Sequence, residues 1–371
     1  MKQLKTLLFP SLLCFFSIGL ATPELKADSF QRDSVSGVFK EVSPSVVFIT
    51  ATSIDPFKII NRVKTGIGSG FIIRKDGLIL TNSHVVFGSQ HIVVTLDDGT
   101  KAIGKLIGAD PLLDLAIIMI PAPSEGLPVI SMGDSNSVQV GEQVMVIGNP
   151  LGLEQTLTVG IVSGVNRILP ESLLGERHPL IQTDAAISPG NSGGPLVNRY
   201  GEAVGVTTAF IYGAQNIGFA LPINIVKEVI PQLVKEGRVI RPWVGIHGKM
   251  IKKEDLSIIN IPLRDGFLVE TVEPGSPAEK GGVHGGELPI VILGTEYLLG
   301  GDVITEINGQ SIDDPETFLK LIRTFKVGDK VTLTLFHQKN TRNVEFNIPE
   351  RPIMPRDLTS EIPRVSVPLM K

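Results

Sequence analysis

Short apolar runs separated by turn residues fill the sequence between residues 46 and 222. Runs such as "VVFITATSI", "GFIIRKDGLIL" and "LDLAIIMI" have the length and β-branched content of strands, and Asp76-Gly77 and Asp98-Gly99 are turn signals. The 39 glycines and 26 prolines of the chain likewise favour many turns over long helices. The segment divides into two successive all-β blocks of roughly 90 residues each, which predicts two packed barrels or sandwiches.

Helical spacing appears on either side of these blocks. Val35, Val38, Phe39 and Val42 share one helix face, which ends at Ser43-Pro44. A second helix is predicted over residues 223–239, "INIVKEVIPQLVKEGRV", with a kink or break at Pro231 because proline lacks the N–H that a helix interior needs.

The N-terminus has the layout of a secretory signal peptide. Lys2 and Lys5 precede an apolar run that ends at Leu20, and the small residue Ala21 follows. We expect residues 1–21 to be removed; a retained membrane anchor is the alternative, although the run is short for a span. The only cysteine, Cys14, lies inside this run, so the mature chain has no thiol for a disulfide, a nucleophile or a metal.

The net charge of the chain and the spacing of its potential metal ligands argue against nucleic-acid binding and against metal binding. A formal charge of −4 without a basic run argues against nucleic acid as the main partner. No cluster of His, Asp or Glu has the spacing of metal ligands, so we expect neither a metal nor a cofactor.

A histidine and an aspartate of the first β block are candidates for a base and its orienting acid. His84, in "LILTNSHVV", follows an apolar strand at a short polar turn; a purely structural histidine is the alternative. Asp114, in "DPLLDLAIIMI", is set in an apolar strand, where a carboxylate needs a partner such as a histidine N–H. We expect Asp110 to be less enclosed and to belong to the turn before Pro111.

The candidate nucleophile lies in the second block, in "ISPGNSGGPLVN". Gly190 and Gly193 let the backbone turn sharply around Ser192, so that the N–H groups of Gly190 and Ser192 could converge as an oxyanion hole. The alternative is a turn whose serine caps a backbone amide. The order His84, Asp114, Ser192 is that of chymotrypsin-type double barrels, and it places the cleft between the two blocks.

Three short motifs resemble the HtrA/Deg family of serine proteases: "TNSHVV", "DLA" and "GNSGGPL". The resemblance implies a mainly β chain, with a chymotrypsin-like double β-barrel protease domain over residues 22–240. It also implies that His84 is the general base, Asp114 the orienting acid and Ser192 the nucleophile. Residues 351–371 are rich in proline and are expected to be extended or disordered.

The segment 241–350 resembles the PDZ domain of that family, through "RPWVGI", "GFLVETVEPGSPAEKGGV" and "GGDVITEINGQSI". The loop Trp243, Val244, Gly245, Ile246 would bind a C-terminal carboxylate. The peptide would then add as a strand beside residues 246–250, against a helix near 315–325. Residues 284–300 interrupt the pattern and could cover part of the peptide groove or contact a neighbouring subunit. A β-rich interaction domain of another type is the alternative.

The resemblance also suggests specificity and regulation. Ala186, Ile187 and Ile211 would line a pocket for small to medium apolar P1 residues. Asn191 is uncharged and cannot receive a newly formed N-terminal ammonium. Reversible ordering of loops near 165–178, 185–191 and 208–216, driven by the PDZ domain, is therefore the expected switch.

Together with the signal peptide, the resemblance implies an ATP-independent serine endopeptidase that degrades misfolded or damaged proteins outside the cytoplasm, in the periplasm. The resemblance implies a homotrimer or a multiple of trimers assembled through the protease domains. The segment around Phe30 and Phe39 is a candidate contact, although Phe39 could equally be a core residue. Two alternatives stay open: a chaperone-like holdase or scaffold with little proteolysis, and a narrow regulatory protease of one signalling substrate.

Overall fold

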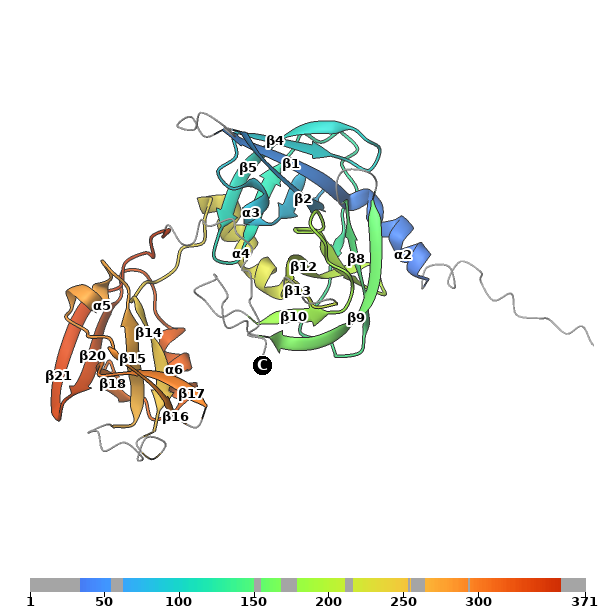
Figure 1. Cartoon of the computed structure of the whole chain (residues 1–371). Helices are drawn as coiled ribbons and strands as arrows, with labels where there is room; N and C mark the ends of the chain where they lie inside the picture. The colour runs from blue at the N-terminus through green and yellow to red at the C-terminus, as the bar shows by residue number, and fades with distance from the viewer. Residues whose placement is uncertain are drawn as a thin grey trace, which may run out of the picture.

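The computed structural model describes residues 34–54, 63–149, 155–167, 179–210, 216–252, 254, 264–292 and 294–354. They fold into two β-barrels and a smaller β-rich unit (Figure 1). The predicted signal peptide, Phe30, Ile211 and the tail beyond Met354 lie outside the described residues. No helix in the described part of the chain has both the length and the apolar character needed to cross a bilayer.

The first barrel is preceded by the predicted short helix, α2 (Val35–Val42). The Ser34 hydroxyl caps it by accepting a hydrogen bond from the Gly37 N–H at 3.1 Å, and Val38 and Val42 are buried, as the spacing predicted. A 3₁₀ turn, Ser43–Ser45, ends the helix at Pro44. Six strands then close into a barrel in the order β1-β2-β3-β6-β5-β4, with bounds β1 (Val46–Ile54), β2 (Val63–Arg74), β3 (Leu78–Thr81), β4 (His91–Thr95), β5 (Lys101–Asp110) and β6 (Leu115–Met119).

The second barrel also has six strands, in the order β11-β8-β9-β10-β13-β12, and closes where β11 pairs with β12. Its bounds are β8 (Gln143–Gly148), β9 (Thr156–Arg167), β10 (Leu180–Thr183), β11 (Pro195–Asn198), β12 (Glu202–Phe210) and β13 (Gly218–Pro222). The short strand β7 (Ser131–Met132) adds in parallel to β12. The prediction of a mainly β chain with two packed barrels is confirmed.

One apolar core joins the two barrels. Phe71, Leu80 and Ile117 of the first barrel belong to the same buried cluster as Ile147 and Leu221 of the second. Each fully buried side chain of this size contributes about 1.5–3 kcal/mol. The barrels are therefore held against each other, and residues at their facing strand ends are fixed in relative position.

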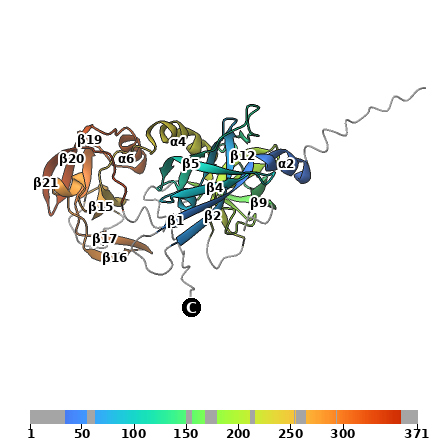
Figure 2. The same cartoon turned by 90° about the horizontal axis from the view of Figure 1, so that it is seen from above.

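Helix α4 (Ile223–Glu236) follows the second barrel and lies on the side of the barrels that faces the third unit (Figure 1, Figure 2). Of the predicted kink or break at Pro231, the break does not occur, because the helix continues past it to Gly237, which adopts a left-handed conformation (φ 73°). Val226 before the proline and Leu233 after it are both buried in the shared core. Their burial outweighs the loss of one helical hydrogen bond.

The third unit is a twisted sheet in the order β14-β15-β18-β20-β21, with β19 paired to β18. The elements are β14 (Ile246–Ile251), β15 (Gly266–Val272), α5 (Pro277–Lys280), β18 (Val303–Ile307), β19 (Gln310–Ser311), α6 (Pro315–Ile322), β20 (Lys330–His337) and β21 (Asn340–Asn347). β14 is an edge strand, so its outer side is open to an added strand. α6 packs on one face of the sheet, where Phe318 stacks on Phe267 with ring centroids 4.4 Å apart.

The segment 284–300 forms a hairpin of β16 (Leu288–Ile292) and β17 (Thr295–Leu299). Ile292 and Leu299 pack with Leu268 and Phe336 in a separate core on the face of the sheet opposite α6. The hairpin therefore lies on the face of the sheet opposite α6, the helix expected to flank the peptide groove. This disfavours the first of its two predicted roles, covering part of that groove, while contact with a neighbouring subunit stays a prediction.

Candidate active site

His84 lies on a single helical turn, α3 (Ser83–Val86), directly after β3. The neighbouring Val85 and Val86 are buried in the core of the first barrel. They anchor the turn, while the imidazole itself stays 23% exposed. The sequence thus places a rigidly held histidine at a strand end within reach of the surface.

Asp114 is the last residue of the turn between β5 and β6, immediately before the strand in which it was expected. One carboxylate oxygen, Oδ2, lies 2.7 Å from His84 Nδ1, and the other, Oδ1, accepts the His84 backbone N–H at 2.9 Å. Asp114 has a φ of 52°, which is uncommon for a residue with a side chain. Its carbonyl is held by the Asn82 side-chain amide at 2.8 Å.

Thr208, on β12 of the second barrel, is a third partner in this arrangement. Its hydroxyl donates to Asp114 Oδ2 at 2.9 Å, so this oxygen is shared between Thr208 and His84. The carboxylate of the first barrel is therefore oriented from both barrels.

The pKa of His84 results from opposing effects. Burial of the imidazole acts to lower it, but the negative charge of Asp114 and the hydrogen bond to that carboxylate outweigh the burial. The pKa of His84 is thus raised above its ordinary value, and the protonated imidazole is stabilised. A base that must hold a proton during a reaction needs this environment.

Ser192 follows a tight turn in which the Asn191 N–H donates to the Ser188 carbonyl at 2.9 Å. Gly190, the third residue of the turn, has a φ of 103°, a value that favours glycine. Ser192 is buried, and its carbonyl accepts the Ser69 N–H of the first barrel at 2.8 Å. A Cβ added to Gly68 would lie 2.6 Å from a Val85 methyl and 3.0 Å from the Ser192 carbonyl, so Ser192 packs beside the residue that follows His84.

Two backbone N–H groups at this turn have no acceptor in the described part of the chain. Within the part of the chain that the structure describes, the N–H groups of Gly190 and Ser192 donate to no protein acceptor. Within the same part, no hydrogen bond joins the Ser192 hydroxyl to His84. Such bonds are often long in unliganded enzymes and tighten when substrate binds.

The predicted specificity residues are only partly placed. Ala186 is exposed, and its carbonyl accepts the Thr158 hydroxyl at 2.9 Å. The Ile187 side chain packs against Gly218 of β13, where an added Cβ would lie 2.6 Å from it. Ile211 lies outside the described residues.

Comparison with known proteins matches both parts of the chain. Residues 68–206 match the family model of the trypsin-like peptidase domain, and residues 244–348 match the PDZ domain. "Protease Do-like 1, chloroplastic" of Arabidopsis thaliana is 35% identical over 365 residues, which cover 93% of this chain and 81% of that protein. The chain belongs to the HtrA family of serine proteases.

Other HtrA-family proteins are similar over much of the chain. A Brucella suis protein named "Probable periplasmic serine endoprotease DegP-like" is 36% identical over 77% of this chain, which spans only 53% of that relative, about half its length. The solved structure of the HtrA-type protease AlgW with a decapeptide has a TM-score of 0.69 at 31% identity, covering 86% of this chain and all of that one. The serine endoprotease from Yersinia pestis is 29% identical, with a TM-score of 0.64.

The backbone carbonyls of the predicted carboxylate loop of this HtrA-family chain are hydrogen-bonded within the PDZ domain. The Val244 and Gly245 carbonyls accept the N–H groups of Ala278 and Glu273 at 3.2 and 2.8 Å. Among the described residues, the N–H groups of Val244 and Gly245 donate to no protein acceptor. The Trp243 side chain is buried and donates to Glu273, so it supports the loop from within the domain.

The expectation that Asp110 is less enclosed than Asp114 is wrong. Asp110 is the last residue of β5 and is more deeply buried than Asp114. Its two carboxylate oxygens bind the Arg241 guanidinium at 2.9 and 2.6 Å. Arg241 is 131 positions away, at the start of the PDZ segment, so no local pattern around Asp110 indicates the pair.

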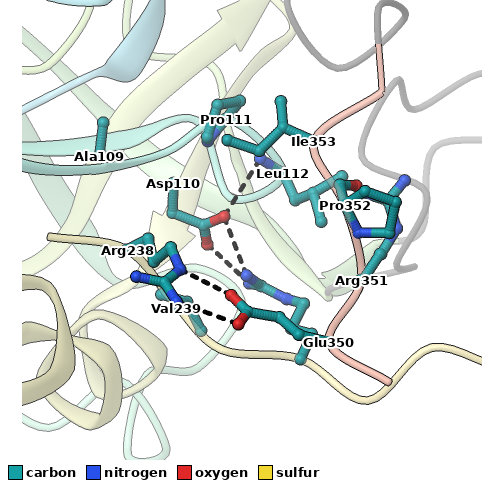
Figure 3. Close-up of a pocket in the computed structure, with 11 residues that line it drawn as sticks. Ala109, Asp110, Pro111, Leu112, Arg238, Val239, Glu350, Arg351, Pro352 and Ile353 are labelled. Carbon is teal, nitrogen blue, oxygen red and sulfur yellow. Dashed lines mark hydrogen bonds and ion pairs between the residues drawn. The ribbon is translucent and has the colours of Figure 1, made fainter. Parts of the chain in front are cut away.

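Figure 3 shows the residues around Asp110 at this junction, where Asp110 and Glu350 both line a cavity of about 470 Å³. A second, more exposed pair joins Arg238 Nε to Glu350 at 2.6 Å. The Arg241 carbonyl also accepts the Arg351 N–H at 2.8 Å, which ties the beginning of the PDZ segment to its end. The PDZ domain is thus joined directly to the strand that leads to Asp114.

Three hydroxyl-bearing residues that contact the site were not predicted from the sequence: Ser69, Thr207 and Thr208. Each lies in a stretch of a strand that otherwise holds only glycine and apolar residues, "GIGSGFII" in β2 and "AVGVTTAF" in β12. A polar side chain in such a strand needs a hydrogen-bond partner, and this was the signal that could have indicated them.

Proposed function

We propose that the protein is a serine endopeptidase in which Ser192 is the nucleophile, His84 the general base and Asp114 the orienting acid. The observation that carries the proposal is the hydrogen-bonded chain Thr208–Asp114–His84 beside a turn whose Gly190 and Ser192 N–H groups donate to no acceptor among the described residues. These are the parts that acyl transfer requires: a base, its orienting acid and two donors for an oxyanion.

The chemistry follows from these positions. As Ser192 Oγ attacks the scissile carbonyl carbon, His84 Nε2 takes its proton. The carbonyl oxygen becomes negative and is bound by the N–H groups of Gly190 and Ser192. His84 then protonates the leaving amine, and water hydrolyses the acyl-enzyme by the same route. The raised pKa of His84 supports the first proton transfer, because Asp114 stabilises the imidazolium that forms.

The substrates of the proposed enzyme are misfolded or damaged proteins, which it cuts without ATP. Exposed Ala186 and the apolar Ile187 beside the turn support small to medium apolar P1 residues. The lysine-flanked apolar run before Ala21 and the periplasmic location in the name of the Brucella suis relative support a site of action in the periplasm. We expect a homotrimer or a multiple of trimers.

Regulation by the PDZ domain is part of the proposal. The N–H groups of Val244 and Gly245, which have no acceptor among the described residues, and the edge position of β14 support binding of peptide C-termini. The Asp110–Arg241 pair supports coupling, because it joins the PDZ segment to the strand before Asp114. A typical coupling free energy of about 1–3 kcal/mol would raise activity roughly 5- to 150-fold.

A substrate panel tests this proposal: unfolded casein, a stably folded protein, and casein with an apolar C-terminal peptide added. We expect rapid cleavage of casein, little cleavage of the folded protein, and faster casein cleavage with the peptide. Casein bound but left uncut would indicate a holdase instead. Cleavage restricted to one defined substrate would indicate a narrow regulatory protease.

A further inference from the structure

Ser69 is a fully buried polar residue in β2 of the first barrel, and it contacts the turn of the second barrel that carries Ser192. Its backbone N–H donates to the Ser192 carbonyl at 2.8 Å, and its hydroxyl donates to the Gly190 carbonyl at 2.6 Å. The same hydroxyl oxygen accepts the Asn149 N–H at 2.9 Å. Its single O–H is therefore committed to Gly190.

The position of Ser69 is fixed in turn by its own barrel. The Thr81 hydroxyl donates to the Ser69 carbonyl at 2.7 Å, and Thr81 ends β3, two positions before the helical turn that carries His84. A Cβ added to Gly193 would lie 2.3 Å from the Ser69 carbonyl, which shows how closely the turn packs against this strand.

The hydrogen bonds of Ser69 act on the backbone between the two oxyanion donors. The Gly190–Asn191 peptide group links the Gly190 N–H to the Asn191–Ser192 peptide group, which carries the Ser192 N–H, so the orientation of these two groups determines whether the donors converge. The first is held by Ser69 at its carbonyl and by Ser188 at its N–H. The carbonyl of the second is held by the Thr207 hydroxyl at 2.6 Å.

We propose that Ser69 is a positioning residue for the oxyanion hole, which its hydroxyl keeps in place by holding the Gly190 carbonyl. The inference rests on the proposed serine-protease function and deepens it. Ser69 touches no reacting atom and acts through the N–H groups of Gly190 and Ser192. Since an oxyanion hole stabilises the transition state more than the bound substrate, loss of the hydroxyl lowers kcat and leaves KM nearly unchanged.

The test compares Ser69→Ala with Ser45→Ala. Ser45 is a matched control in the same domain: it is buried, and its hydroxyl also donates to a backbone carbonyl, that of Val42 at 2.7 Å. We measure kcat and KM on a chromogenic peptide with an apolar P1 residue. We also measure inhibition by a peptide boronic acid, whose tetrahedral adduct with Ser192 places an oxygen in the oxyanion hole.

Relative to Ser45→Ala, we expect Ser69→Ala to lower kcat roughly 10- to 100-fold, somewhat less than the loss of a whole oxyanion donor. The inhibition constant of the boronic acid should rise by a similar factor, and KM should stay within about threefold. Kinetics and inhibition equal to those of Ser45→Ala would overturn the proposal, as would a raised KM with unchanged kcat.

Two further variants keep the result interpretable. If circular dichroism shows that Ser69→Ala does not fold, Ser69→Cys, which keeps a weak donor, is held to the same criteria. Ser192→Ala separates this proposal from the one on which it rests. If cleavage depends on Ser192 but Ser69→Ala lowers it no more than Ser45→Ala does, only the positioning role is overturned. Wild-type protein without Ser192-dependent cleavage would overturn both.

Discussion

The buried ion pair between the barrels and the PDZ segment makes a strong prediction about stability. The side chains of Arg241 and Asp110 are only 10% and 4% exposed, whereas those of Arg238 and Glu350 in the neighbouring pair are 49% and 33% exposed. Removing one partner of a buried pair leaves an uncompensated charge and costs about 3–5 kcal/mol. An exposed pair contributes about 0–1 kcal/mol. Asp110→Asn should therefore destabilise the protein far more than Glu350→Gln.

Trp243 offers a direct assay of this junction. It is the only tryptophan of the chain, it is buried, and it lies two positions after Arg241. We would follow its fluorescence during unfolding in urea, which does not screen ion pairs as a guanidinium salt does. A Ser192→Ala background prevents self-cleavage. With a slope of about 1–3 kcal/mol per M, Asp110→Asn should lower the midpoint by at least about 1 M, and Glu350→Gln by a fraction of that.

The reasoning is refuted if the two variants unfold at the same urea concentration. A double-mutant cycle adds a second check, because Arg241→Met in the Asp110→Asn background should cost much less than Arg241→Met alone. Additive effects would mean that the two side chains do not stabilise each other.

Three other predictions concern the site and the PDZ loop. Because His84 must be neutral to act as a base and its pKa is raised, kcat/KM should be lost as the pH falls through a midpoint above about 6.5; a midpoint near pH 5 would contradict this. Thr208→Val removes a hydrogen bond to the Asp114 carboxylate and should lower kcat/KM roughly 10- to 100-fold, and unchanged kinetics would exclude a role for Thr208. Gly245→Ala would place a Cβ 2.2 Å from that of Ser276 at a φ of 79°, so titration of an apolar C-terminal peptide should show binding weakened at least about 10-fold; equal affinity would place the carboxylate elsewhere.

Features that depend on near neighbours in the sequence could be predicted. The helix at Val35–Val42 follows from apolar spacing and from Pro44, and the strands of both barrels follow from short β-branched runs between turn signals. His84 and Asp114 were paired by chemistry alone, because a carboxylate among apolar residues needs a donor, and their side chains are in contact. Here local physical chemistry was sufficient.

Features that depend on distant partners could not be predicted. The burial of Asp110 depends on Arg241, and the path of α4 through Pro231 depends on the core of the two barrels. A second core under residues 284–300 was not predicted. The face of the sheet that the hairpin covers is built from four separate strands, β14, β15, β18 and β20. In each case the deciding contact is made across the fold and leaves no local signal.

The central claim is that Ser192 carries peptide-bond hydrolysis, and one substitution tests it most directly. Cleavage of unfolded casein and labelling by a fluorophosphonate are measured on the wild-type protein and on Ser192→Ala, with folding checked by circular dichroism. We expect a folded variant that is not labelled at this site and whose cleavage rate is lower on the order of 10⁴-fold or more, as for nucleophiles of such triads. A pure, folded Ser192→Ala protein that still cuts casein at the wild-type rate would contradict the claim.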